Sequence, residues 1–118
     1  MAKSQSNETD FSDWVNSVLL VGRVSSESEE INLPSGETLI RFRIVIPREI
    51  TSRQAPSRAT VDTIDCVTFK PVVQKKVRTL QVGTIVELEG QIRRRFWKAG
   101  AGVASRVEVE VVTIKRMA

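Results

Sequence analysis

The sequence contains no histidine and only one cysteine, Cys66, among its 118 residues. Histidine is the commonest general base and a frequent metal ligand, and a lone cysteine cannot form an internal disulfide. The first dozen residues lack the apolar core of a signal peptide, and no apolar run approaches the roughly 20 residues that span a bilayer. We therefore expect a cytoplasmic chain without a membrane segment, a metal site or another cofactor.

The carboxylates form no convincing acid–base pair either. Glu87 and Glu89, and likewise Glu108 and Glu110, stand two residues apart and alternate with apolar residues. Since alternate side chains of a strand point to opposite faces, this pattern predicts solvent-facing charges beside a buried apolar row. Cys66 has no histidine to activate it and is predicted to be a small buried or half-buried residue. The sequence thus favours a protein that is not an enzyme.

Charge is distributed unevenly along the chain, whose formal net charge is +4. Residues 1–30 carry two basic and six acidic side chains, whereas residues 31–118 carry sixteen basic and eight acidic ones. A basic domain favours a nucleic-acid partner, because neutralising phosphates releases condensed counterions. A basic surface that is only solvated has the same composition, so charge alone leaves both interpretations open.

The chain length suits one domain. Residues 1–12 are polar without an apolar period and are predicted to form a flexible N-terminal tail, followed by a single domain over residues 13–118. Apolar alternation and β-branched residues predict five strands, near residues 17–24, 40–46, 61–69, 84–97 and 106–111. Gly22, inside the first of them, indicates a bulge or a sharp bend. The last two strands are joined by a predicted loop over residues 98–104.

One helix is predicted between the third and fourth strands. Pro71 suits a first helical turn, Val73, Val77 and Leu80 recur on one face, and Gly83 is expected to end the helix. Five strands left as an open sheet would expose long edges. We therefore predict an all-β fold, a five-stranded Greek-key barrel of the OB-fold type with one short helix.

The densest group of candidate binding residues stands at the end of the fourth predicted strand, over residues 93–98. Its guanidinium groups can bind phosphates, and its aromatic rings offer flat faces on which bases stack. Alternation places Arg93, Arg95 and Trp97 on one face. Alternatively, Trp97 or Phe96 caps the barrel core while the arginines are solvated.

Further basic side chains can extend this surface from neighbouring strands and from the long polar loop over residues 47–60. Alternatively, these side chains are only solvated and bind no ligand. The additional candidates for DNA contact are Arg41, Arg43, Arg48, Arg53, Arg58, Lys70 and Arg106, together with the aromatic Phe69.

Two sequence blocks resemble the bacterial single-stranded DNA-binding protein family. One is Asn-Ser-Val-Leu-Leu-Val-Gly-Arg-Val over residues 16–24, and the more specific one is Val-Gly-Thr-x-Val-x-x-x-Gly-x-x-Arg-x-Arg-x-Trp over residues 82–97. The resemblance implies an OB-fold assembled as a homotetramer, with a dimer as the fallback. It also implies sequence-independent binding of single-stranded DNA in replication, recombination or repair, at the nucleoid, and replication or repair proteins as partners.

Carried over position by position, Trp97 and Phe69 match two base-stacking aromatics of the family, and Arg93 and Arg95 match basic residues along its DNA path. Thr63 and, in the long loop, Ile50 or a neighbour stand where the family often has further stacking tryptophans. The resemblance therefore implies a depleted stacking surface and a larger share for salt-sensitive arginine contacts.

The resemblance does not extend to the acidic, partner-binding tip of the family, because residues 114–118 are basic. Together with the depleted aromatics, this difference favours an alternative from another functional class. That alternative is an OB-fold protein-interaction module, or primosome-like accessory, with weak DNA binding.

Overall fold

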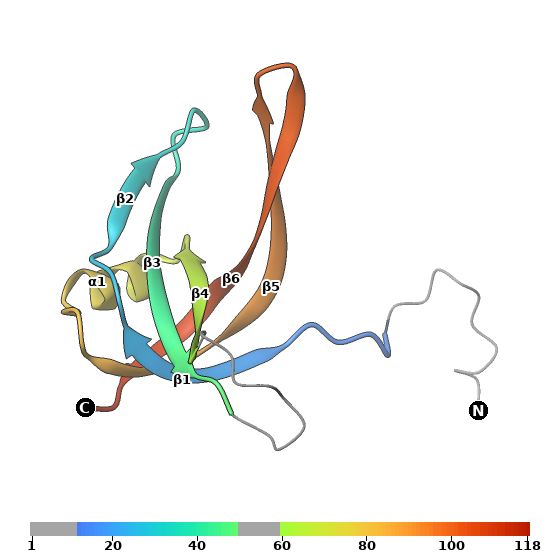
Figure 1. Ribbon diagram of the computed structural model, residues 1–118. Coiled ribbons are helices and arrows are strands. Elements are labelled where there is room, and N and C mark those ends of the chain that lie inside the picture. The colour runs from blue at the N-terminus through green and yellow to red at the C-terminus, as the bar shows by residue number, and fades with distance from the viewer. Residues whose placement is uncertain (1–11, 50–59) are drawn as a thin grey trace.

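A computed structural model describes residues 12–49 and 60–118 of the chain, which form six strands and one helix (Figure 1). The tail predicted over residues 1–12 lies almost entirely outside the described residues. In chain order the elements are β1 (Val18–Val24), β2 (Glu29–Asn32), β3 (Thr38–Pro47), β4 (Val61–Thr68), α1 (Pro71–Arg78), β5 (Ile85–Ala99) and β6 (Gly102–Arg116).

Five of the strands close into a barrel. Around the ring β1 pairs with β5, β5 with β6, β6 with β4, and β4 with β3. The ring closes where Arg23 and Val24 of β1 pair with Val45 and Ile44 of β3. These pairings are antiparallel except that of β4 with β6. The predicted five-stranded OB-fold barrel, with its helix between the third and fourth barrel strands, is confirmed.

The structure adds one short strand, β2, that the sequence did not predict. Its sequence, Glu-Glu-Ile-Asn, has little strand propensity. β2 nevertheless pairs with β3, where Glu29 lies opposite Arg41. The Glu30 carboxylate accepts a hydrogen bond of 3.3 Å from Nε of Arg78 on the helix. Pairing with β3 and an ion pair to the helix thus hold an acidic segment in extended form.

The barrel interior is apolar, and α1 packs against it. The core residues come from the barrel strands and from one side of the helix, and are Val24, Ile40, Phe42, Ile44, Cys66, Val73, Val77, Val86, Leu88, Val109, Val111 and Ile114. The helix is shorter than predicted: it ends at Arg78, where the N–H of Thr79 donates to the carbonyl oxygen of Lys76 and the N–H of Leu80 donates to that of Val77. Leu80 still packs against the core, as its spacing predicted.

β5 and β6 continue beyond the barrel as a two-stranded arm, which rises in Figure 1 on the same side of the molecule as the β2–β3 hairpin. Strand pairing runs to Ala99 and Gly102, so only Gly100 and Ala101 form the turn, with Gly100 at φ 58°. The left-handed region suits glycine because it has no Cβ. The predicted loop over residues 98–104 is therefore wrong, since most of these residues are paired strand.

The register of the sheet also differs from the sequence prediction at one glycine. β1 pairs with β5 in an unbroken register through Gly22, so this residue carries no bulge in that pairing. The register shift lies instead between Glu89 and Gly90, where β5 slips by one residue against β6. A bulge of this kind increases local twist and helps a strand to bend around a barrel.

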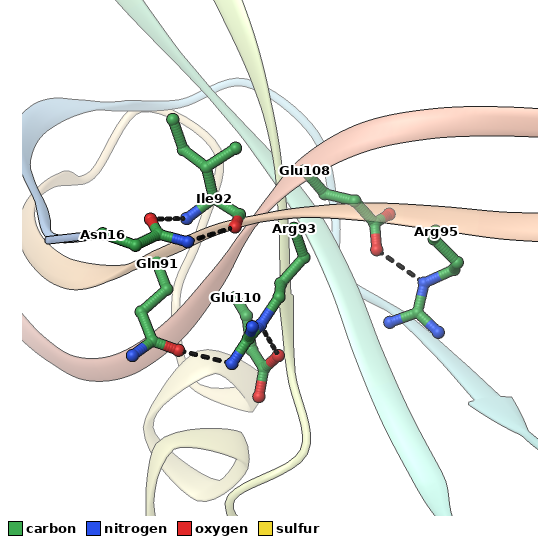
Figure 2. Close-up of polar contacts among 7 residues, drawn as sticks. All are labelled: Asn16, Gln91, Ile92, Arg93, Arg95, Glu108 and Glu110. Atoms are coloured by element: carbon green, nitrogen blue, oxygen red, sulfur yellow. Dashed lines mark hydrogen bonds and ion pairs between the residues drawn. The ribbon is translucent and has the colours of Figure 1, made fainter. Parts of the chain in front are cut away.

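Asn16 fixes the segment that leads into β1. Its side-chain amide donates a hydrogen bond of 2.8 Å to the carbonyl oxygen of Ile92 and accepts one of 2.9 Å from the N–H of the same residue (Figure 2). One side chain thereby satisfies both backbone groups of Ile92, as a neighbouring strand would. The segment before β1 is therefore attached to the base of the arm.

Candidate nucleic-acid interface

One outer face of the sheet carries half of the predicted site residues. Directly paired residues of neighbouring strands point to the same side of a sheet, and the opposite side here faces the apolar core. We call this outer surface the arginine face. Its members are Arg41, Arg43, Asp65, Val67, Arg93, Arg95, Trp97, Arg106, Glu108 and Glu110.

The arginine face is hollowed between the β2–β3 hairpin and the arm. The groove has a volume of about 280 Å³ and is lined by Ile31, Leu33, Leu39, Arg41, Arg95, Trp97 and Arg106. Trp97 is 43% exposed, and the guanidinium carbon of Arg106 lies 5.9 Å from the centre of its ring. The groove thus combines an accessible indole with three guanidinium groups, which suits a base and its neighbouring phosphates.

Most arginines predicted for phosphate contact are paired with carboxylates. Nε of Arg43 donates a hydrogen bond of 2.8 Å to Asp65. Arg93 donates from Nε to Glu110, over 3.2 Å, and from Nη2 to the side-chain oxygen of Gln91, over 2.7 Å (Figure 2). These partners fix the guanidinium groups in position and neutralise part of their charge. Sequence analysis identified the arginines but not their partners.

Arg48 stands beside the arginine face, one residue after β3. Its Nη2 donates a hydrogen bond of 2.6 Å to Oδ1 of Asp62, and its N–H bonds the carbonyl oxygen of Thr60. The hydrogen bond lowers the pKa of Asp62 and raises the pKa of Arg48, so both groups stay charged around neutral pH. Arg48 therefore connects the two ends of the long loop through its contacts with Thr60 and Asp62.

Glu108 corrects a prediction, because its side chain is fully buried rather than solvent-facing. Oε2 accepts a hydrogen bond of 2.7 Å from Nε of Arg95 (Figure 2), and Oε1 lies 3.6 Å from Nη2 of Arg41. A charge is buried in proteins only where opposite charges compensate for the lost water. Strand alternation gave the right face for Glu108, but this part of the face is covered by two arginines from β3 and β5.

Phe69 and Lys70 follow β4 and lie next to the arginine face. Phe69 is half-buried, and the guanidinium carbon of Arg95 lies over its ring, 5.3 Å from the centre. Lys70 is exposed and precedes the first turn of α1. Arg95 therefore contacts both a buried carboxylate and an aromatic ring that the resemblance assigns to base stacking.

Phe96 lies on the face of the arm opposite Trp97, as alternation along β5 requires. It is 64% exposed and pairs with Ser105, whose hydroxyl accepts a hydrogen bond of 3.0 Å from Nη1 of Arg94. The structure therefore does not bring Phe96 into the groove. Arg53 and Arg58 lie outside the described residues, and Thr63 is exposed on the same side of β4 as Asp65 and Val67.

The single cysteine of the chain is not placed for catalysis. Cys66 is fully buried, as predicted, and burial, followed by the charges of Asp65 and Glu108, raises the pKa of its thiol to about 12. Such a thiol is neutral and inert at neutral pH. Within residues 12–49 and 60–118, no group of His, Cys, Asp and Glu side chains could hold a metal ion. In the same two ranges, no helix has the length and apolar character of a membrane span.

Known structures share this fold. The chain is similar to a Plasmodium falciparum SSB solved in complex with ssDNA, with a TM-score of 0.75 and 18% identity over 96% of this chain and 100% of that one. It is also similar to the small single-stranded DNA-binding protein of Streptomyces coelicolor, with a TM-score of 0.60 and 16% identity over 86% of this chain and 93% of that one.

Sequence relatives give the family. The chain is 34% identical to the single-stranded DNA-binding protein of Thermotoga maritima over 84% of its own length and 70% of the relative's. It is 28% identical to single-stranded DNA-binding protein 1 of Staphylococcus aureus over 75% of its own length, and spans about half of that relative, 52%. The family model described as "Single-strand binding protein family" matches residues 15–117. The chain therefore belongs to the single-strand binding protein family.

Proposed function

We propose that this protein binds single-stranded DNA without sequence preference, through the groove of the arginine face. The observation that carries the proposal is the exposed indole of Trp97 beside the guanidinium groups of Arg41, Arg95 and Arg106 in one groove. The names of its relatives point to the same ligand. The proposal includes a role in replication, recombination or repair, at the nucleoid in the cytoplasm, with proteins of those processes as partners.

The ion pairs of the arginine face are compatible with phosphate binding. A guanidinium group has five N–H donors, so one hydrogen bond to a carboxylate leaves others available. The face holds five arginines against the four carboxylates of Asp65, Glu108, Glu110 and Glu29, which is paired with Arg41, and thus keeps an excess of positive charge. Stacking on Trp97 supplies contact to any base, and the arginines supply contact to any phosphate, which accounts for the absence of sequence preference.

Titration with oligothymidine at a low and a high salt concentration tests this function. We expect DNA to quench the fluorescence of Trp97, and the affinity to fall as salt rises, because phosphate contacts release counterions. A double-stranded oligonucleotide of the same length is the control and should bind more weakly. Absence of binding at low salt would contradict the proposal and favour the protein-interaction module.

The proposal extends to a homotetramer, with a dimer as the fallback. Within the described residues, the first part of β1 pairs with β5 on one side, and its other edge carries no strand. Leu19 and Val21 point away from the core and are 62% and 47% exposed. Free strand edges and exposed apolar rows favour self-association, and several copies would also bind a long strand with avidity.

Substitution Leu19→Asp is expected to dissociate this assembly, because it places a charge in the apolar row of β1. Light scattering coupled to gel filtration at micromolar concentration measures the effect. Val72→Asp is the matched control, since Val72 is 67% exposed on α1 and lies outside the proposed interface. A monomeric wild-type protein, or a Leu19→Asp variant of unchanged mass, would argue against association through β1.

A further inference from the structure

Glu108 is bound unequally by two arginines. Nε of Arg95 donates to Oε2 over 2.7 Å, whereas Nη2 of Arg41 approaches Oε1 only to 3.6 Å, beyond hydrogen-bond distance. Oε1 of Glu108 and Nε of Arg41 are both buried and make no hydrogen bond with any residue the structure describes. A buried polar group left unpaired costs free energy. One carboxylate oxygen is thus hydrogen-bonded to Arg95, and the other is only approached by Arg41.

Arg95 in turn covers Phe69. Its guanidinium carbon lies 5.3 Å from the centre of the Phe69 ring while its Nε bonds Glu108. Arg95 also lines the groove, and 28% of its side chain is exposed. The arginine that the buried carboxylate holds therefore occupies a position over an aromatic ring where a base would stack, within reach of a phosphate in the groove.

We propose that Glu108 is a latch that holds Arg95 over Phe69 and withholds this ring from stacking until Arg95 is drawn away. A DNA phosphate in the groove competes with Glu108 for the guanidinium group of Arg95. When Arg95 turns toward the phosphate, Arg41 remains beside the carboxylate and can satisfy Oε1. One phosphate contact thereby uncovers one stacking ring. Glu108 acts through Arg95 and is a positioning residue.

The latch rests on the proposed function and predicts how Phe69 and Glu108 depend on each other. In the wild-type protein, uncovering Phe69 breaks the hydrogen bond between Arg95 and Glu108, which offsets most of the free energy gained by stacking. Phe69→Leu, which keeps most of the apolar volume, should therefore lower the affinity for oligothymidine by less than about twofold. Glu108→Gln removes the charge that holds Arg95 and keeps the side-chain shape. In that background Phe69→Leu should lower the affinity by about fivefold or more, because an open ring stacks a base.

Two further backgrounds separate the latch from a general change of charge. Glu110→Gln removes one negative charge from the same strand and the same face, but its partner is Arg93. In this background the effect of Phe69→Leu should stay below about twofold. Arg95→Lys keeps the positive charge but lacks the planar guanidinium group that bonds Glu108 and covers the ring of Phe69. In this background Phe69→Leu should therefore have the larger of the two effects on affinity. Arg95→Lys also replaces Glu108→Gln if that variant fails to fold.

Anisotropy of a labelled oligothymidine gives the affinities, and thermal unfolding establishes that each variant is folded. A Phe69→Leu effect of the same size in all four backgrounds overturns the latch, whether that effect is large or small. If the wild-type protein does not bind at low salt, the proposed function itself is wrong. The two failures are therefore distinguishable.

Discussion

Replacing Gly90 by alanine is expected to lower the free energy of unfolding by about 3 kcal/mol or more, as severe overpacking does. A Cβ atom at this position would overlap the carbonyl oxygen of Glu110 and lie 2.9 Å from its carbonyl carbon. Both are backbone atoms of β6, so they cannot turn aside as a side chain would. Relief requires β5 and β6 to separate at the register shift. Urea unfolding measures the loss.

Gly102→Ala is the matched control in the same hairpin. A Cβ atom on Gly102 would meet no described heavy atom within 4 Å, and its φ is not positive. We expect a change of less than about 0.5 kcal/mol, as for other unconstrained surface positions. Equal urea midpoints for Gly90→Ala and Gly102→Ala would show that the bulge tolerates a side chain, contrary to this geometry.

The barrel was predictable because its core residues alternate along the strands. Ile40, Phe42 and Ile44 line one side of β3, and each is buried by the amphipathic pattern that also predicted the strand. β2 was not predictable, since its acidic sequence resists strand formation and Arg78, which forms an ion pair with Glu30, lies far along the chain. Local pattern thus determines the elements with an apolar face, and tertiary contacts determine the rest.

The site was predictable in its residue types and only partly in its geometry. Alternation correctly placed Arg93, Arg95 and Trp97 on one face, because it depends only on the local backbone. The burial of Glu108 depends on Arg41, which is far away in sequence and is brought near because β3 and β6 both pair with β4. Ion pairs between residues so distant in sequence leave no periodic signal, so solvent exposure was the natural but wrong expectation.

Substitution Trp97→Ala is expected to weaken binding of oligothymidine by about 1 to 3 kcal/mol, the usual contribution of one stacked base. Trp97 is the aromatic residue that lines the groove, and it is 43% exposed, so its removal should leave the barrel folded. Anisotropy of a labelled oligonucleotide measures the loss. The fluorescence of Trp97 itself is followed in a Trp14→Phe background, because Trp14 is also exposed and would add a second signal.

Phe96→Ala is the control for this prediction, since Phe96 neighbours Trp97 in sequence but lies on the opposite face of the arm. It is the more exposed of the two rings, at 64%, so exposure alone would predict the larger effect for Phe96. Because Phe96 lies outside the groove and stacks no base, we expect Phe96→Ala to have the smaller effect and to lower the affinity by less than about twofold. A larger loss for Phe96→Ala than for Trp97→Ala, in folded variants, would move the DNA path to the other face of the arm.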